Sequence, residues 1–236
     1  TITEDTASAL NTALSDAQVN AYNLTVNGTT ATASDLIALD GKTSGTINTN
    51  TNITTITGSA ADLKTVLEAG GIDTAANVNA TITGTTVATL AELKAINNAT
   101  SGTITLNTES NSANYSGTVA DVKAAFTGIT TVTGTITLTD GSVSVADINL
   151  VAPVTTGAVI ATVTSGAASV LNGLTTTSTD AITMTVNAEA ASAATQAADL
   201  VSLNGKTNQV ITMTAVTKVS GSYADLVDVY VTNAAN

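Results

Sequence analysis

The sequence predicts an α/β protein, a repeat solenoid of about nine strand–helix coils with a parallel β-sheet. Two observations carry this prediction. A short amphipathic helical segment, clearest in Gly58–Leu67, recurs along the chain with an acidic or hydroxyl residue in its first turn. Between these segments, aliphatic residues alternate with threonine, as in half-buried strands. The alternative is an all-β or α+β repeat array.

The recurring first-turn residue gives the number of coils. Its positions are Ser8, Asp35, Asp62, Glu92, Asp121, Asp147, Ser169, Asp199 and Asp225. They follow one another at intervals of 22 to 30 residues, which predicts nine degenerate units. In six units a Ser or Thr stands three residues before the acid, as Ser59 does before Asp62, and this is the spacing of a capping box. Leu63, Val66 and Leu67 then form an apolar stripe. Because so short a helix is marginal alone, it depends on packing against its neighbours.

The strand-like stretches lie between the helical segments. They are Leu24–Val26, Thr81–Thr83, Thr103–Leu106, Thr135–Leu138, Ile182–Val186 and Ile211–Thr214. Some units contain two, as in Thr46–Asn48 followed by Ile53–Thr57. We expect the aliphatic side chains to point inward and the threonines outward. Residues 1–236 form a single repeat domain in this interpretation, with an irregular coil or kink near residues 147–169, where the only proline, Pro153, lies.

Composition excludes several classes of function. Of the 236 residues, 43% are hydrophobic but only 2% are aromatic, so the core is built from small aliphatic side chains. The net charge of −12, with 6 basic residues, argues against a nucleic-acid partner and against an anionic membrane. Cysteine and histidine are absent, which removes disulfides, thiolate nucleophiles, imidazole catalysis and the usual zinc sites. The sequence therefore predicts no enzyme, no cofactor and no insertion into a membrane.

Two Gly-Lys-Thr sequences, at Gly41–Thr43 and Gly205–Thr207, invite comparison with a phosphate-binding loop. Such a loop requires another glycine five residues before the first residue of each triplet, where Leu36 and Leu200 stand. The favoured interpretation is a helix C-terminus, with glycine at the C′ position and lysine near the last carbonyls.

The acidic residues have a structural explanation as helix caps, so no catalytic pair is predicted. Calcium stays open as a ligand, because carboxylate, carbonyl and asparagine oxygens are plentiful. However, Gly70–Asp73 does not continue into the nonapeptide calcium repeat. The Thr-x-Thr pairs have three interpretations: a soluble β-surface, a docking face for another copy, or a face that orders ice.

Three stretches carry a resemblance to a known kind of sequence: Ala31–Asn48, Thr54–Leu67 and Ala197–Thr207. They resemble the tandem Thr/Ala/Gly-rich repeats of very large secreted bacterial cell-surface proteins, including surface-layer and adhesin-like ones. The resemblance implies an extracellular, acidic and cysteine-free structural array at the cell surface, and it transfers no functional residue.

The first functional hypothesis is an extracellular structural repeat protein that self-assembles into a surface layer, sheath or filament. We expect a head-to-tail homopolymer, because a solenoid ends in coils with unpaired strand edges. The expected assembly ends, both interpreted as strands, are Thr1, Ile2 and Thr3, and Val229, Tyr230 and Val231. The alternative is an adhesin or binding module that recognises cell-surface glycans or ice through Thr-rich strand faces.

Overall fold

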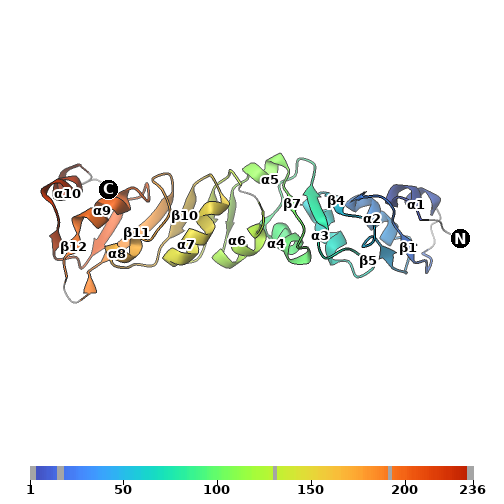
Figure 1. Cartoon of the computed structure of the whole chain (residues 1–236), viewed down its shortest axis with the longest axis horizontal. Coiled ribbons are helices and arrows are strands. Elements are labelled where there is room, and N and C mark those ends of the chain that lie inside the picture. Colours follow the sequence, from blue (N-terminus) through green and yellow to red (C-terminus); the bar gives the residue numbers. More distant parts are fainter. Residues whose placement is uncertain (1–3, 15–18, 130–131, 191–192, 233–236) are drawn as a thin grey trace. The chain divides into compact units, whose positions relative to one another are not determined.

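A computed structural model describes residues 4–14, 19–129, 132–190 and 193–232. The chain divides into two compact units, residues 1–112 with 124–130 and residues 113–123 with 131–236. In each unit helices alternate with short strands, and all strand pairs among the described residues are parallel (Figure 1). The predicted α/β class is therefore confirmed, and the all-β alternative is wrong.

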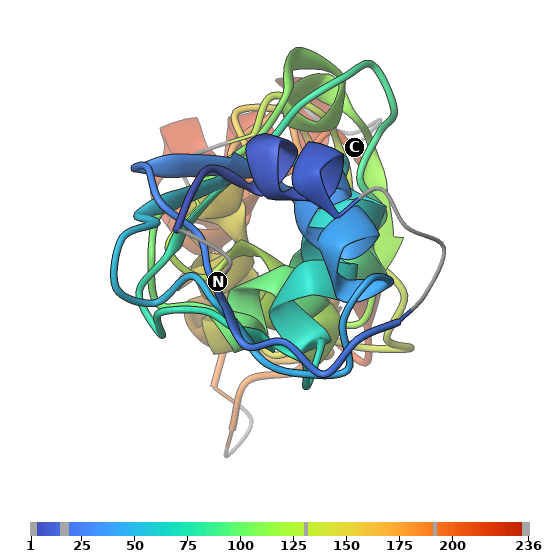
Figure 2. The same cartoon turned by 90° about the vertical axis from the view of Figure 1, so that its right-hand side faces the viewer.

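The first unit contains two parallel sheets and a row of helices. Its elements are α1 (Ala7–Ala13), β1 (Leu24–Thr25), β2 (Thr30–Thr32), α2 (Ala33–Asp40), β3 (Ile47–Asn48), β4 (Thr55–Gly58), α3 (Ala60–Glu68), β5 (Ile72–Asp73), β6 (Asn79–Ile82), α4 (Leu90–Ala99), β7 (Ile104–Thr105) and α5 (Thr108–Ser112). The sheet orders are β1-β3-β5 and β2-β4-β6-β7. Consecutive helices from α1 to α4 pack against each other, and Figure 2 shows α1 in dark blue beside α2. In both sheets the strands lie in the same order as along the chain.

The second unit repeats this plan with longer strands. Its elements are β8 (Tyr115–Gly117), β9 (Ile136–Leu138), α7 (Val145–Val151), the 3₁₀ turn η1 (Ala152–Val154), β10 (Val159–Thr162), α8 (Ala168–Leu171), β11 (Ala181–Asn187), β12 (Thr195–Gln196), α9 (Ala197–Asn204), β13 (Ile211–Thr214), β14 (Val219–Ser220), α10 (Tyr223–Val227) and the π-helical turn η3 (Asp228–Thr232). Helix α6 (Val119–Phe126) begins in this unit, and its residues from Ala124 onward group with the first. The sheet orders are β13-β11-β10-β9-β8 and β12-β14.

The predicted helix starts are confirmed. Seven of the nine aligned residues occupy the third helical position, and the two serines occupy the second. The hydroxyl of the cap residue accepts a hydrogen bond from that third residue's amide in all six predicted pairs. Among the helices whose caps the structure describes, α4 has the full box, since Glu92 also accepts from the amide of its cap residue, Thr89, at 2.8 Å. In α2 the shorter Asp35 accepts from the hydroxyl of Thr32 instead. The aspartate units therefore contain a half-box, because their side chain lacks one methylene.

Small aliphatic side chains fill the interior of both units, as predicted. Fully buried examples include Leu36, Leu63, Ile56 and Ile136. Along each strand the inward residue is buried while its threonine neighbours are more exposed, as in the Thr55–Gly58 strand around Ile56. Burying side chains of this size contributes about 1.5–3 kcal/mol each. Strands β13 and β14 depart from the pattern, since none of their residues is buried.

Two local expectations are wrong. Gly41 and Gly205 close α2 and α9 with negative φ values of −65° and −76°, so neither adopts the left-handed C′ conformation. The segment Val229–Val231, expected to be a strand, belongs to the π-helical turn η3 that continues α10. Its residues follow the Ser222 cap, and the helical spacing of Leu226 and Tyr230 prevails over their strand propensity.

Candidate functional site

Four of the contacts between neighbouring repeats share one arrangement, built around a buried threonine. Thr43 follows α2 and lies against the previous repeat. Its hydroxyl accepts from the amides of Tyr22 and Gly45 at 3.1 and 3.0 Å. It directs its proton toward the carbonyls of Asn20 and Tyr22, at 2.8 and 2.5 Å. One side chain thereby adds four hydrogen bonds to the isolated parallel bridge that Asn20 and Thr43 form between two repeats.

Three further threonines do the same in the two units. The corresponding hydroxyl-to-carbonyl bonds join Thr100 to Val78 at 2.6 Å, Thr155 to Gly134 at 2.5 Å and Thr207 to Ile182 at 2.8 Å. We call Thr43, Thr100, Thr155 and Thr207 the junction threonines. Each stands four residues before a strand begins, namely β3, β7, β10 and β13. All four are buried, so each set of bonds is protected from water.

A glycine two residues after the junction threonine allows the close approach. Gly45, Gly102 and Gly157 lie against carbonyl groups of the previous repeat. A Cβ at Gly102 would lie 2.6 Å from the carbonyl oxygen of Asn77, and closer still to that of Val78. The amides of all three glycines donate to the junction hydroxyls. Threonine and glycine thus form one structural unit at these junctions.

The junction threonines were not singled out from the sequence. A signal exists in the repeated tetrapeptide Thr-Ser-Gly-Thr at Thr43–Thr46 and Thr100–Thr103, with a variant at Thr155–Ala158. Only the three-dimensional pairing shows that its first residue bonds to the preceding repeat.

Asparagine and lysine side chains add to the junctions. Asparagine oxygens accept amide protons from the next repeat in the pairs Asn23–Thr46, Asn79–Thr103 and Asn114–Thr135. The ammonium of Lys42 donates to the carbonyl of Asn11, in the last turn of α1. That of Lys206 donates to the carbonyl of Leu174, after α8. The two lysines of the Gly-Lys-Thr sequences therefore bond to carbonyls of the preceding repeat, and not to the last carbonyls of their own helices as predicted.

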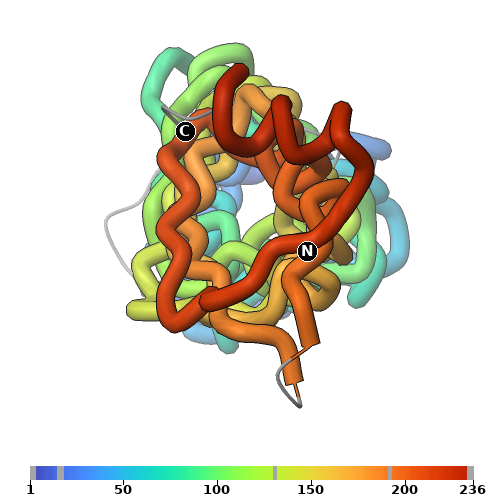
Figure 3. The backbone as a smooth tube through the Cα atoms, turned by 90° about the vertical axis from the view of Figure 1, so that its left-hand side faces the viewer, coloured from blue at the N-terminus to red at the C-terminus, as the bar shows by residue number. Residues whose placement is uncertain are grey.

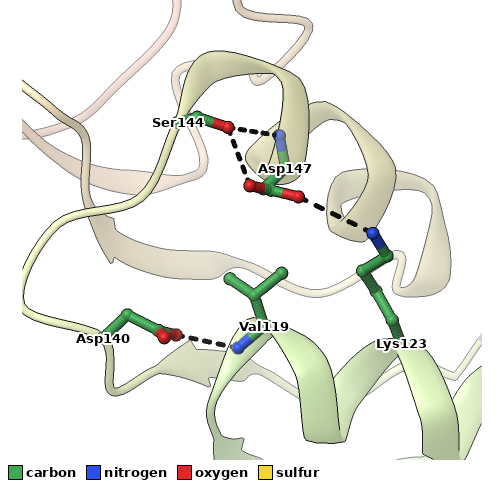
Figure 4. A network of polar contacts seen from close by, with 5 residues as sticks. All are labelled: Val119, Lys123, Asp140, Ser144 and Asp147. Carbon is green, nitrogen blue, oxygen red and sulfur yellow. Dashed lines mark hydrogen bonds and ion pairs between the residues drawn. The ribbon is translucent and has the colours of Figure 1, made fainter.

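Charged groups near α6 and α7 likewise hold backbone and helix ends together (Figure 4). Asp140 accepts from the amide of Val119 at 2.8 Å. Asp147 accepts from the hydroxyl of its cap residue, Ser144, and lies 3.6 Å from the ammonium of Lys123. The ion pair is exposed, so its contribution to stability is small.

Two cavities among the described residues are lined almost entirely by neutral side chains. A cavity of about 680 Å³ in the first unit is lined by neutral residues, among them Asn97 and Thr100. A second of about 420 Å³, in the second unit, contains the carboxylate of Asp180. That carboxylate accepts from the amides of Val159 and Thr177, both at 2.7 Å. Among the described residues no group of three or more acidic side chains is placed to hold a metal ion, and no helix is long and apolar enough to span a membrane.

The sheet β2-β4-β6-β7 presents an ordered row of threonines. Thr32, Thr57, Thr81 and Thr105 stand in register on its four strands. A second row, two residues earlier, contains Thr30, Thr55 and Asn79. We call these seven residues the threonine face. Between the rows, Ala31, Ile56 and Ala80 are buried, so the threonines point outward. In β1-β3-β5 the outward row is Thr25, Asn48 and Asp73, without this regularity.

The structure describes only one of the two expected assembly ends. Thr1, Ile2 and Thr3 lie outside the described residues. Tyr230 and Val231 are exposed on η3, and Val229 is half-buried. Their role in assembly stays a prediction.

Comparison with known proteins found no matching family, no similar curated protein and no similar solved structure. The fold and the repeat junctions define the class, an α/β protein with parallel sheets.

Proposed function

We propose that this protein is an extracellular structural repeat protein, a solenoid of about nine strand–helix coils that self-assembles into a surface layer, sheath or filament. Its role is to present a regular scaffold of repeats, and no catalytic step is assigned to it. Copies meet head to tail, so that assembly remains open.

One observation carries this proposal: the same junction recurs at Thr43, Thr100, Thr155 and Thr207. At these four junctions the repeats are held by parallel backbone pairing and by the hydroxyl of a buried threonine. The carboxylate of Asp180, in one of the cavities, is likewise engaged in holding the backbone. A chain whose polar side chains serve its own repeat junctions is suited to building an extended structure.

The extracellular location rests on composition and on the resemblance to repeats of secreted surface proteins. The chain has no cysteine to oxidise and a net charge of −12, which keeps it soluble outside the cell. The same charge opposes association, so salt or calcium ions should promote assembly.

The test is negative-stain electron microscopy of the purified chain, with analytical ultracentrifugation over a range of protein and salt concentrations. We expect sheets or filaments that grow with protein concentration and with salt. Monomers that persist at millimolar protein, with and without calcium, would refute a self-assembling role.

A second candidate function is ice binding through the threonine face. Unequal repeat lengths argue against a regular array, yet Thr32, Thr57, Thr81 and Thr105 stay in register, because the loops absorb the differences. Parallel strands place the rows about 4.8 Å apart, and outward residues on one strand about 6.6 Å apart. The face carries no charge, and β-branched side chains have few rotamers, so hydroxyl and methyl groups are held in a lattice.

Thermal hysteresis at millimolar protein tests this candidate. We expect hysteresis and faceted ice crystals from the wild type, and loss of both in Thr57→Lys, which breaks the central row. Thr25→Lys, on the other sheet, is the matched control and should retain them. A wild type without hysteresis excludes ice as the ligand.

A further inference from the structure

The strand and helix pairs of the described residues join neighbouring repeats. The sheet orders β1-β3-β5, β2-β4-β6-β7 and β13-β11-β10-β9-β8 all follow the order of the strands along the chain. The helices that pack closely are consecutive ones, α1 with α2, α2 with α3 and α3 with α4 in the first unit, and α8 with α9 and α9 with α10 in the second. In Figure 3 the red trace of α10 lies in front of the orange trace of the repeat before it. Each repeat is thus held by the one before it and the one after it.

The bonds of the junction threonines follow the same rule. Their hydroxyls bond to carbonyls that lie one repeat earlier, 21 residues back from Thr43 and from Thr155, 22 back from Thr100 and 25 back from Thr207. Each set of bonds therefore joins one pair of repeats. Releasing a repeat at the end of a sheet breaks the bonds of its own junction and leaves those of the next junction in place.

The strand order also determines where tension acts. Because strand order follows chain order, the chain enters each of these sheets at one edge strand and leaves it at the other, as at β1 and β5. Tension on the two ends of the chain therefore reaches the edge strands first. An edge strand has a partner on one side only, so it can leave without disturbing the pairing of the remaining strands. The next strand then becomes the edge, and its own junction holds it.

We propose that this protein is an extensible tether whose repeats unfold one at a time under tension and refold when the tension falls. The inference goes beyond self-assembly, because it concerns a single copy of the chain. An array with contacts between neighbours alone lacks the long-range contacts that make a compact domain open as a whole. One released repeat of 22 to 30 residues lengthens the chain by about 7–10 nm, after the width of its strand in the sheet is subtracted. The edge strand left behind is the template on which that repeat refolds.

Optical tweezers that hold the full chain by its two ends test the proposal. We expect a series of steps of about 7–10 nm, one for each repeat, which reverse as the force is lowered. One or two large steps, in which the whole chain or a whole compact unit opens at once, would overturn the proposal.

Thr100→Val tests the independence of the repeats, because it removes the hydroxyl of a single junction. At a fixed force it should raise the ratio of unfolded to folded time for one step by about tenfold or more, and leave the other steps unchanged. Thr65→Val is the matched control, since the exposed hydroxyl of Thr65 bonds to the carbonyl of Ala61 within α3. It should behave like the wild type, and circular dichroism checks that each variant folds.

The outcomes are separate from those for self-assembly, because each trace records one molecule. If Thr100→Val shifts every step together, or shifts none, the junctions do not control the release of single repeats and the proposal is wrong. A wild type that extends stepwise but stays monomeric in solution supports the tether and refutes the assembling role. A wild type that assembles but opens in one large step does the reverse.

Discussion

Replacing Gly102 by alanine tests whether the repeats depend on their close junctions. The new Cβ would lie 2.6 Å from the carbonyl oxygen of Asn77 and nearer still to that of Val78. Both atoms are backbone, so neither moves without shifting the previous repeat. The shift would also stretch the bonds that the Thr100 hydroxyl makes to Gly102 and Val78, at 2.9 and 2.6 Å.

The cost follows from two terms. Overpacking of this kind costs about 1–3 kcal/mol. Loss of buried hydrogen bonds at the junction adds a cost of similar size, about 1–3 kcal/mol. We therefore expect Gly102→Ala to lower the free energy of unfolding by about 2–6 kcal/mol.

Urea denaturation followed by circular dichroism measures this change, with Gly70→Ala as the control. A Cβ at Gly70 meets nothing within 4 Å. Alanine there should be neutral or stabilise by about 0.4–1 kcal/mol, because it restricts the unfolded chain. Both variants replace glycine by alanine, but Gly102→Ala should lower the free energy of unfolding, whereas Gly70→Ala should leave it unchanged or raise it. Equal midpoints for both variants would refute the idea that junction spacing limits stability.

Two further substitutions probe the hydrogen bonds themselves. Thr100→Val removes the junction hydroxyl with little change in shape and should cost about 1–3 kcal/mol in urea denaturation, since it leaves buried backbone groups unsatisfied. The same change at exposed Thr105 should stay within about 0.5 kcal/mol, and a similar loss at both sites would contradict a junction role. Glu92→Asp converts the full capping box of α4 into the half-box of the aspartate units. It should cost about 0.5–1.5 kcal/mol, because the bond to the Thr89 amide is lost; hydrogen exchange of that amide should rise, and unchanged exchange would refute the length argument.

The helices were predictable because their signals are local. A cap such as Ser59 and an acid such as Asp62 act within one turn, so spacing alone identifies them. The difference between Asp35 and Glu92 in the capping bond depends on side-chain length and becomes visible only in the structure. Helix α5 was not predicted, since its residues have no apolar stripe; Asn107 starts it by accepting from the amide of Ser110.

The strands were predictable in position but not in their grouping. Alternation places Ile47 and Ile56 inward, yet it does not show that their strands belong to different sheets of the first unit. Sheet membership depends on which residues turn the chain between strands, and these turns have no periodicity. The prediction of a strand at Val229–Val231 was wrong for a related reason. Its β-branched residues predict a strand, whereas a helix was already started upstream at Ser222.

The composition and the junctions have one physical explanation. Repeats of 22 to 30 residues with few aromatic residues bury little apolar surface each, so backbone groups lie close to the edge of each repeat. A charged residue there would need a partner, and a larger one would separate the coils. Threonine supplies both donor and acceptor on a short stem, and glycine removes the side chain that would obstruct it. Because each junction joins only adjacent repeats, a substitution at one junction should destabilise mainly the two repeats that meet there.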